Sequence, residues 1–121
     1  MAFLSRRNGT ILYAPPMAKS RMEMLEEFVR EQPADAFAHY GLALEYAKAG
    51  RAEDALALFQ KLLGFSPDYT AAYYQAGALL GKLGRVDEAR AMFQRGIEVA
   101  GRNGDFHTKS ELEQALHELP A

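Results

Sequence analysis

The fold is decided by residues 36–69, which read AFAHYGLALEYAKAGRAEDALALFQKLLGFSPDY, because the next 34 residues repeat their pattern without a gap. Residues 70–103 read TAAYYQAGALLGKLGRVDEARAMFQRGIEVAGRN. A fixed period of roughly 20–50 residues indicates stacked structural units, none of which can bury its apolar face alone. The identical positions include Gly50 with Gly84, Ala55 with Ala89, and Phe59 with Phe93.

Each copy predicts two helices with a break between them. In residues 36–69, apolar residues recur at helical spacing on both sides of Gly50, and a glycine suits the left-handed residue that ends a helix. Pro67 closes the first copy, because the residue before a proline is pushed out of helical geometry. The second copy has the same break at Gly84, but Gly101 stands where the closing proline would be.

The repeated unit resembles the tetratricopeptide repeat, a helix–turn–helix unit of 34 residues. Neither copy has the tryptophan of that family, and His39 and Tyr73 stand in its place. The resemblance implies an all-α fold, a short tetratricopeptide-type α-solenoid of about six antiparallel helices. The residues that match the pattern of the family are Ala43, Tyr46, Gly50, Ala55, Phe59, Pro67, Gly77, Gly84, Ala89 and Phe93.

The segments on either side of the repeats predict one helix each. A cap helix is expected at 20–32, where Ser20 and Glu23 form a capping box. Its apolar side chains, Met24 and Phe28 among them, are expected to face the first repeat. A C-terminal capping helix is expected at 105–119, with a second capping box at Thr108 and a polar outer side, as the end of a solenoid requires.

These elements together predict one folded domain over residues 17–121, made of the cap helix 20–32, the repeats 36–69 and 70–103, and the helix 105–119. Residues 1–16 look unlike the rest, since a short apolar island is followed by two prolines. We expect them to form a disordered N-terminal tail.

Composition excludes several classes of function. A net charge of -2 gives no basic footprint for binding nucleic acid. No apolar run approaches the roughly 18 residues of a membrane-spanning helix. The chain has no cysteine, which suits a reducing compartment, so a cytoplasmic location is expected.

The sequence also contains no group of residues typical of a catalytic or metal-binding site. His39, His107 and His117 lack the spacing of metal ligands, and His39 is expected to be a packed core residue. Carboxylates that are adjacent in sequence, such as Glu53 and Asp54, do not share a helix face and so do not form an acid pair. We therefore expect no catalytic residue, no cofactor and no metal, and the chain is not predicted to be an enzyme.

The first helix of each copy is apolar on two opposite sides. In the first copy, Leu42, Ala43 and Tyr46 face the core, whereas Tyr40 and Leu44 lie nearly opposite. A helix that is apolar on both sides is either buried on both or carries a binding face. In the tetratricopeptide family these helices line a concave groove, which the resemblance implies binds a peptide. The groove candidates are Phe37, Tyr40, Leu44, Lys48, Tyr74, Ala78 and Lys82.

The predicted function is that of a non-enzymatic protein–protein interaction adaptor that binds a partner peptide in this groove. Lys48 and Lys82 recur one repeat apart and favour a partner with apolar anchors followed by acidic residues. Two alternatives stay open. The chain could be a self-associating structural module, such as a homodimer, that uses its exposed helical faces, or the apolar stripe could pack on the chain's own cap or tail.

Overall fold

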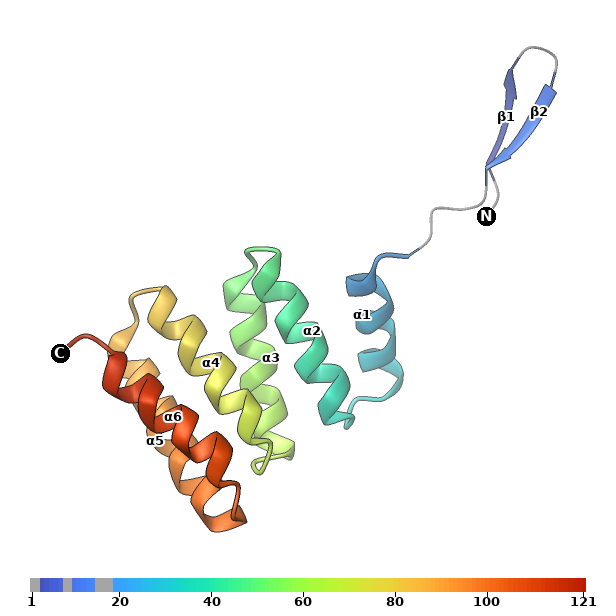
Figure 1. Cartoon of the computed structure of the whole chain (residues 1–121). Helices are drawn as coiled ribbons and strands as arrows, with labels where there is room; N and C mark the ends of the chain where they lie inside the picture. The colour runs from blue at the N-terminus through green and yellow to red at the C-terminus, as the bar shows by residue number, and fades with distance from the viewer. Residues whose placement is uncertain (1–2, 8–9, 15–18) are drawn as a thin grey trace.

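A computed structural model describes residues 3–7, 10–14 and 19–121, and within them it contains six helices and two strands. Each helix packs on the next in antiparallel order, and α2, α4 and α6 also contact one another in series (Figure 1). The predicted all-α solenoid is confirmed. The helices are α1 (Arg21–Glu31), α2 (Ala36–Lys48), α3 (Ala52–Phe65), α4 (Thr70–Lys82), α5 (Val86–Asn103) and α6 (Phe106–Glu118).

Local signals set several helix ends where the sequence predicted them. At the start of α1, the Glu23 N–H donates to Ser20 Oγ at 3.1 Å, and the Glu23 carboxylate accepts from the Ser20 N–H at 3.5 Å. This is the predicted capping box. After α2 and α4, Gly50 and Gly84 adopt φ of 79° and 76°, a left-handed conformation that side chains with a Cβ rarely adopt.

The predicted capping box at Thr108 is wrong, because the N-cap of α6 lies three residues earlier. Asp105 is its N-cap and accepts hydrogen bonds from the Thr108 N–H at 3.2 Å and from the Thr70 hydroxyl at 2.8 Å. The bonds from Thr108 and Thr70 hold the pKa of Asp105 below its ordinary value. Asp105 therefore caps α6 and also joins its start to the start of α4.

The helix α5 has 18 residues, whereas the equivalent α3 has 14. Pro67 follows the end of α3, but Gly101 occupies the same place in the second copy and does not interrupt the helix. α5 therefore continues to Asn103 and ends at Gly104, which has φ of 72°. Because α4 begins at Thr70 and α6 begins at Phe106, the third unit is displaced by two residues from the 34-residue register.

The core lies between the two layers of helices and is built from the repeated small and large residues. Ala55 and Ala89 are fully buried, and Phe59 and Phe93 are almost so. His39 is a packed core residue, as expected. Its Nδ1 lies 2.8 Å from the Asp35 carbonyl oxygen, and its ring meets the Phe65 ring edge-on at 4.9 Å between centroids.

The outer side of α1 differs from the prediction. Leu25 and Val29 pack against the core, but Met24 is 53% exposed and Phe28 is 44% exposed. The reason is that, among the described helices and strands, α1 contacts only α2, so these elements bury only one side of it. The apolar residues of α1 are thus divided between a packed side and an open side.

The N-terminal segment contains β1 (Phe3–Arg7) and β2 (Thr10–Ala14), paired antiparallel with Arg7 opposite Thr10 (Figure 1). These paired strands differ from the disordered tail that the sequence predicts, and the rest of 1–16 lies outside the described residues. The overlooked signal is Asn8-Gly9, the dipeptide most typical of a two-residue hairpin connection. Among the described elements, each strand contacts only the other strand.

Candidate functional site

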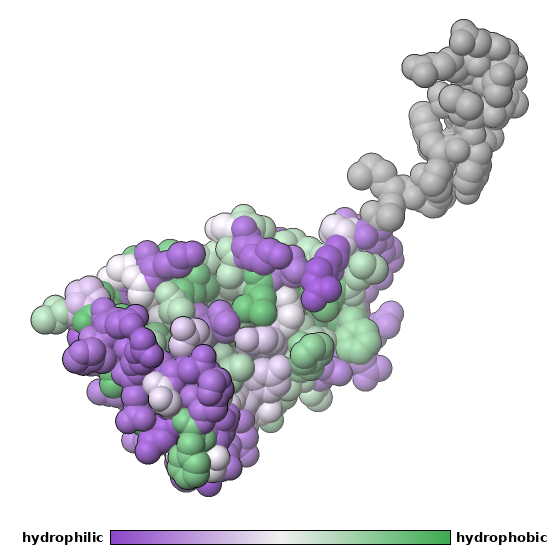
Figure 2. Space-filling model, in the orientation of Figure 1, coloured by the Kyte–Doolittle hydropathy of each residue, from purple (hydrophilic) through white to green (hydrophobic). Residues whose placement is uncertain are grey.

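The helices α2, α4 and α6 lie next to one another and have hollows between them, and we call this surface the groove. α2 and α4 supply mainly aromatic and aliphatic residues, whereas α6 supplies mainly polar ones. The space-filling view shows the same division, with hydrophobic and neutral residues over α2 and α4 and mostly hydrophilic residues over α6 (Figure 2). The lining residues include Tyr40, Leu44, Tyr74, Gln75, Ala78, Lys82, Glu111, Gln114, Ala115 and Glu118.

The hollow between α2 and α4 has a volume of about 160 Å³ and is apolar. Leu44 of α2 and Ala78 of α4 form its sides, and the buried Phe59 lies at its base. Lys82 and Gln75 supply its polar groups. Such a hollow can bury an apolar side chain while a cation and an amide stand beside it.

Tyr40 and Tyr74 are held against the core by other aromatic rings. The Tyr40 ring lies 6.3 Å from Phe59 and 5.2 Å from Tyr69, and the Tyr74 ring lies 6.3 Å from Phe93, measured between centroids. Both tyrosines are half-buried and both line the hollow formed by α2, α4 and α6. Their rings are therefore fixed in place with part of their surface available to a ligand.

The other predicted candidates lie away from the hollows. Phe37, in the first turn of α2, is 76% exposed and lines none of the hollows described here. Lys48 is exposed at the last residue of α2, where its Nζ lies 3.9 Å from a Glu45 carboxylate oxygen. Of the seven predicted residues, the structure brings five together around the hollows: Tyr40, Leu44, Tyr74, Ala78 and Lys82.

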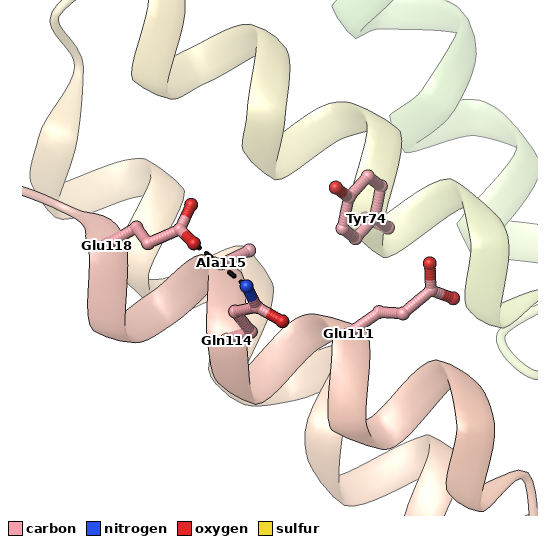
Figure 3. Close-up of a pocket in the computed structure, with 5 residues that line it drawn as sticks. All are labelled: Tyr74, Glu111, Gln114, Ala115 and Glu118. Atoms are coloured by element: carbon pink, nitrogen blue, oxygen red, sulfur yellow. Dashed lines mark hydrogen bonds between the residues drawn. The ribbon is translucent and has the colours of Figure 1, made fainter.

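The contribution of α6 was missed by sequence reasoning. Glu111, Gln114 and Glu118 were assigned to the solvent side of a terminal helix, but they line a hollow of about 150 Å³ opposite Tyr74 (Figure 3). Within this hollow, Gln114 Nε2 donates to Glu118 Oε1 at 3.1 Å. The signal that could have revealed this wall is Gly101, because the missing proline shifts the register of α6.

Two further features can be stated for the described residues. No helix within residues 19–121 is both long and apolar enough to cross a membrane. In the same part of the chain, no three His, Asp or Glu side chains come together in a way that could hold a metal ion.

Comparison with known proteins matches the tetratricopeptide repeat family model to residues 46–110. A solution structure of a tetratricopeptide repeat domain protein from Salinibacter ruber is 41% identical, with a TM-score of 0.69 over 72% of this chain and 88% of that one. A crystal structure of a domain with the same description, from the same organism, has 41% identity and a TM-score of 0.66 over 70% of this chain and 94% of that one. A Bordetella parapertussis protein is 25% identical, with a TM-score of 0.73 over 84% of this chain and 89% of its own.

A search of curated proteins gave no match. The family model nevertheless covers more than half of the chain, and the Salinibacter domain is similar in both sequence and structure across most of it. The repeated 34-residue unit, the paired helices and the glycine turns between them agree with both findings. The chain belongs to the tetratricopeptide repeat family.

Proposed function

We propose that this chain is a non-enzymatic adaptor that holds a segment of a partner protein in the groove. Tetratricopeptide repeats are generally non-catalytic scaffolds for protein–protein interaction. The observation that carries the proposal is the apolar hollow between α2 and α4, which no described residue covers. Leu44 packs partly against the core, and both Leu44 and Ala78 remain partly exposed in the hollow. An apolar hollow with a few polar groups at its edge is the usual form of a binding site.

The groove favours a short, extended partner segment with apolar anchors. Tyr40 and Tyr74 stand one repeat apart and offer rigid aromatic surface that costs little side-chain entropy to bury. Lys82 beside the α2–α4 hollow, and Lys48 at the same end of α2, favour acidic residues in the part of the segment that lies there. Because only three helices form the groove, we expect weak binding.

The test is to select peptides from a random library with the wild-type chain and then measure their affinity by fluorescence anisotropy. Ala78 is partly exposed and lines the α2–α4 hollow, so Ala78→Arg should fill that hollow and reduce the affinity of the selected peptides by at least tenfold. Ala57→Arg makes the same change at an exposed position of α3, outside the groove, and should leave the affinity unchanged. Equal binding by both variants would reject the groove as the site.

A second candidate function, self-association, is favoured by the open side of α1. Met24 and Phe28 are exposed there, and no described element packs beyond them. A second copy of the chain could cover this side. Under this alternative the chain would be a stable dimer, which light scattering at several concentrations would detect.

A further inference from the structure

We infer that the α4–α6 side of the groove selects an arginine side chain in the partner segment. This inference rests on the proposed function and specifies the partner further. It concerns the hollow bounded by Tyr74 on one side and by Glu111, Gln114 and Glu118 on the other (Figure 3).

The three helices of the groove can be compared position by position, because each has 13 residues. At the last position, α2 and α4 carry Lys48 and Lys82, but α6 carries Glu118. The charge at this last position therefore reverses between α4 and α6. A segment that lies across the helices therefore meets cations at one side and carboxylates at the other.

The sixth position of the helices shows the same change. Gly41 in α2 and Gln75 in α4 are uncharged, whereas α6 has Glu111. Glu111 and Glu118 are seven residues apart, which is about two helical turns, so both stand on the groove side of α6. Ala115 lies between them and leaves room for a ligand.

Both carboxylates are available to a cation from a partner. Within residues 19–121, no Lys or Arg side chain forms an ion pair with Glu111 or Glu118. Glu118 accepts the Gln114 amide, and Glu111 Oε1 lies 3.3 Å from His107 Nε2, which carries a charge only when protonated.

The chain itself shows how an arginine is held by such a set of groups. The Arg51 guanidinium lies 4.2 Å from the centre of the Tyr46 ring, and its Nε donates to Asp54 Oδ2 at 2.8 Å. A planar guanidinium can stack on an aromatic ring and also donate to a carboxylate with its edge. An arginine from a partner would lie on the exposed part of the Tyr74 ring in the same way, with Glu111 or Glu118 as its acceptor.

Lysine and acidic residues fit this hollow less well. A lysine ammonium can meet a carboxylate but does not stack as a plane on Tyr74, so it should bind more weakly than arginine. An aspartate or glutamate would face two carboxylates and be repelled. The reversal of charge across the groove would then fix the direction of the bound segment, with its acidic part near Lys82 and its arginine near α6.

The experiment is peptide selection at pH 8 with the wild-type chain, followed by the same selection with Glu111→Gln and Glu118→Gln combined. Peptides selected by the wild type should be enriched in arginine at one fixed position, and this enrichment should disappear with the double variant. Replacing that arginine by glutamine should weaken binding to the wild type by about three- to tenfold, the range of one or two partly exposed charge pairs. The same replacement should hardly affect binding to the double variant.

The matched control combines Glu98→Gln with Glu113→Gln, which changes the net charge equally but at exposed positions outside the hollows of the groove. This control should keep the arginine preference. Loss of the preference in the control, or no arginine enrichment with the wild type, would overturn the inference. If Ala78→Arg weakens peptide binding but Glu111→Gln with Glu118→Gln leaves the arginine preference unchanged, the groove function stands and the arginine inference fails. If no peptide is selected, both fail.

Discussion

Gly77 marks the closest approach between α4 and α5. A Cβ added there would lie 2.3 Å from Phe93 Cε1, and Phe93 is buried and cannot move aside without disturbing the core. We predict that Gly77→Ala lowers the free energy of unfolding by roughly 1–3 kcal/mol through overpacking. Urea denaturation followed by circular dichroism would measure the change.

Gly64 provides the matched control for this prediction. It also lies in a helix, α3, but an added Cβ would meet nothing within 4 Å. Gly64→Ala should therefore raise the free energy of unfolding by up to about 1 kcal/mol, because alanine has the better helix propensity. If both substitutions change stability in the same direction, the close contact between Gly77 and Phe93 does not exist in solution.

Asp105 should make stability depend on pH. Hydrogen bonds from Thr108 and Thr70 lower its pKa in the folded chain, so its carboxylate stabilises the fold at a pH above its unfolded pKa. This contribution should be lost as the pH falls from about 4 through the lowered pKa of the folded state. Asp105→Asn keeps a capping oxygen but cannot titrate.

The measurement is the difference in unfolding free energy between the wild type and Asp105→Asn, taken at pH 7 and at pH 2.5. The wild type should be the more stable at pH 7, and the difference should shrink at pH 2.5. Asp68→Asn, at an exposed position before α4, corrects for the general effect of removing one carboxylate. A difference that stays constant with pH would contradict the role of Asp105.

Residue-level features could be predicted where their cause is local. The capping box of Ser20 and Glu23 and the glycine turns at Gly50 and Gly84 depend only on neighbours in the sequence. The cap of α6 could not be chosen from the sequence in this way, because Asp105 and Thr108 both suit an N-cap. What favours Asp105 is its bond to Thr70, which is far away in the chain.

At the level of the helices, the length of α5 determines where α6 stands. Gly101 is inside α5, and proline at this place would remove a helical hydrogen bond and collide with the preceding turn. We predict that Gly101→Pro lowers the free energy of unfolding by about 3 kcal/mol or more and reduces the helix content near the C-terminus. Thermal unfolding and amide chemical shifts of α6 would measure both effects.

Gly101→Ala is the control for the proline substitution. An added Cβ would lie 3.9 Å from Lys109 side-chain atoms, which is ordinary contact, so this variant should be at least as stable as the wild type. If alanine destabilises the chain as much as proline does, the site is limited by space rather than by helix geometry. The explanation given for the long α5 would then be wrong.

The sequence predicted the helices well and the groove only in part. The repeated spacing of small and large residues specifies α2 to α5, and Tyr40 and Tyr74 follow from the same register. The groove residues of α6 could not be predicted from the 34-residue repeat, because the extra turn of α5 displaces α6 by two residues from that repeat. The strands β1 and β2 were missed because an apolar island between polar residues and prolines was read as a tail, without regard to Asn8-Gly9.

For the whole molecule, we predict that the helices fold independently of residues 1–16. The strands β1 and β2 contact each other but none of the helices. Removing residues 1–16 should therefore leave the midpoint of thermal unfolding unchanged within about 1 °C, since strands that do not contact the helices contribute little to the stability of the helices. A clear decrease in the midpoint would show that this segment packs on the helices in solution.

The oligomeric state decides between the adaptor and the self-associating module. Met24 and Phe28 are the exposed apolar residues of α1, and isolated apolar side chains of this kind are normal on monomeric proteins. A stable interface usually buries roughly 1,200–2,000 Å², which one short helix does not supply by itself. We therefore predict that light scattering gives the mass of a single chain from about 10 μM to 1 mM.

If a dimer forms instead, two variants identify the surface that holds it together. Met24→Lys combined with Phe28→Lys places two charges on the open side of α1, so it should dissociate a dimer built through that side. Ala78→Arg should dissociate a dimer in which a second copy occupies the groove. The first result would support self-association through the end of the solenoid. The second would mean that the partner segment belongs to another copy of this chain, and the groove would keep its role as the binding site.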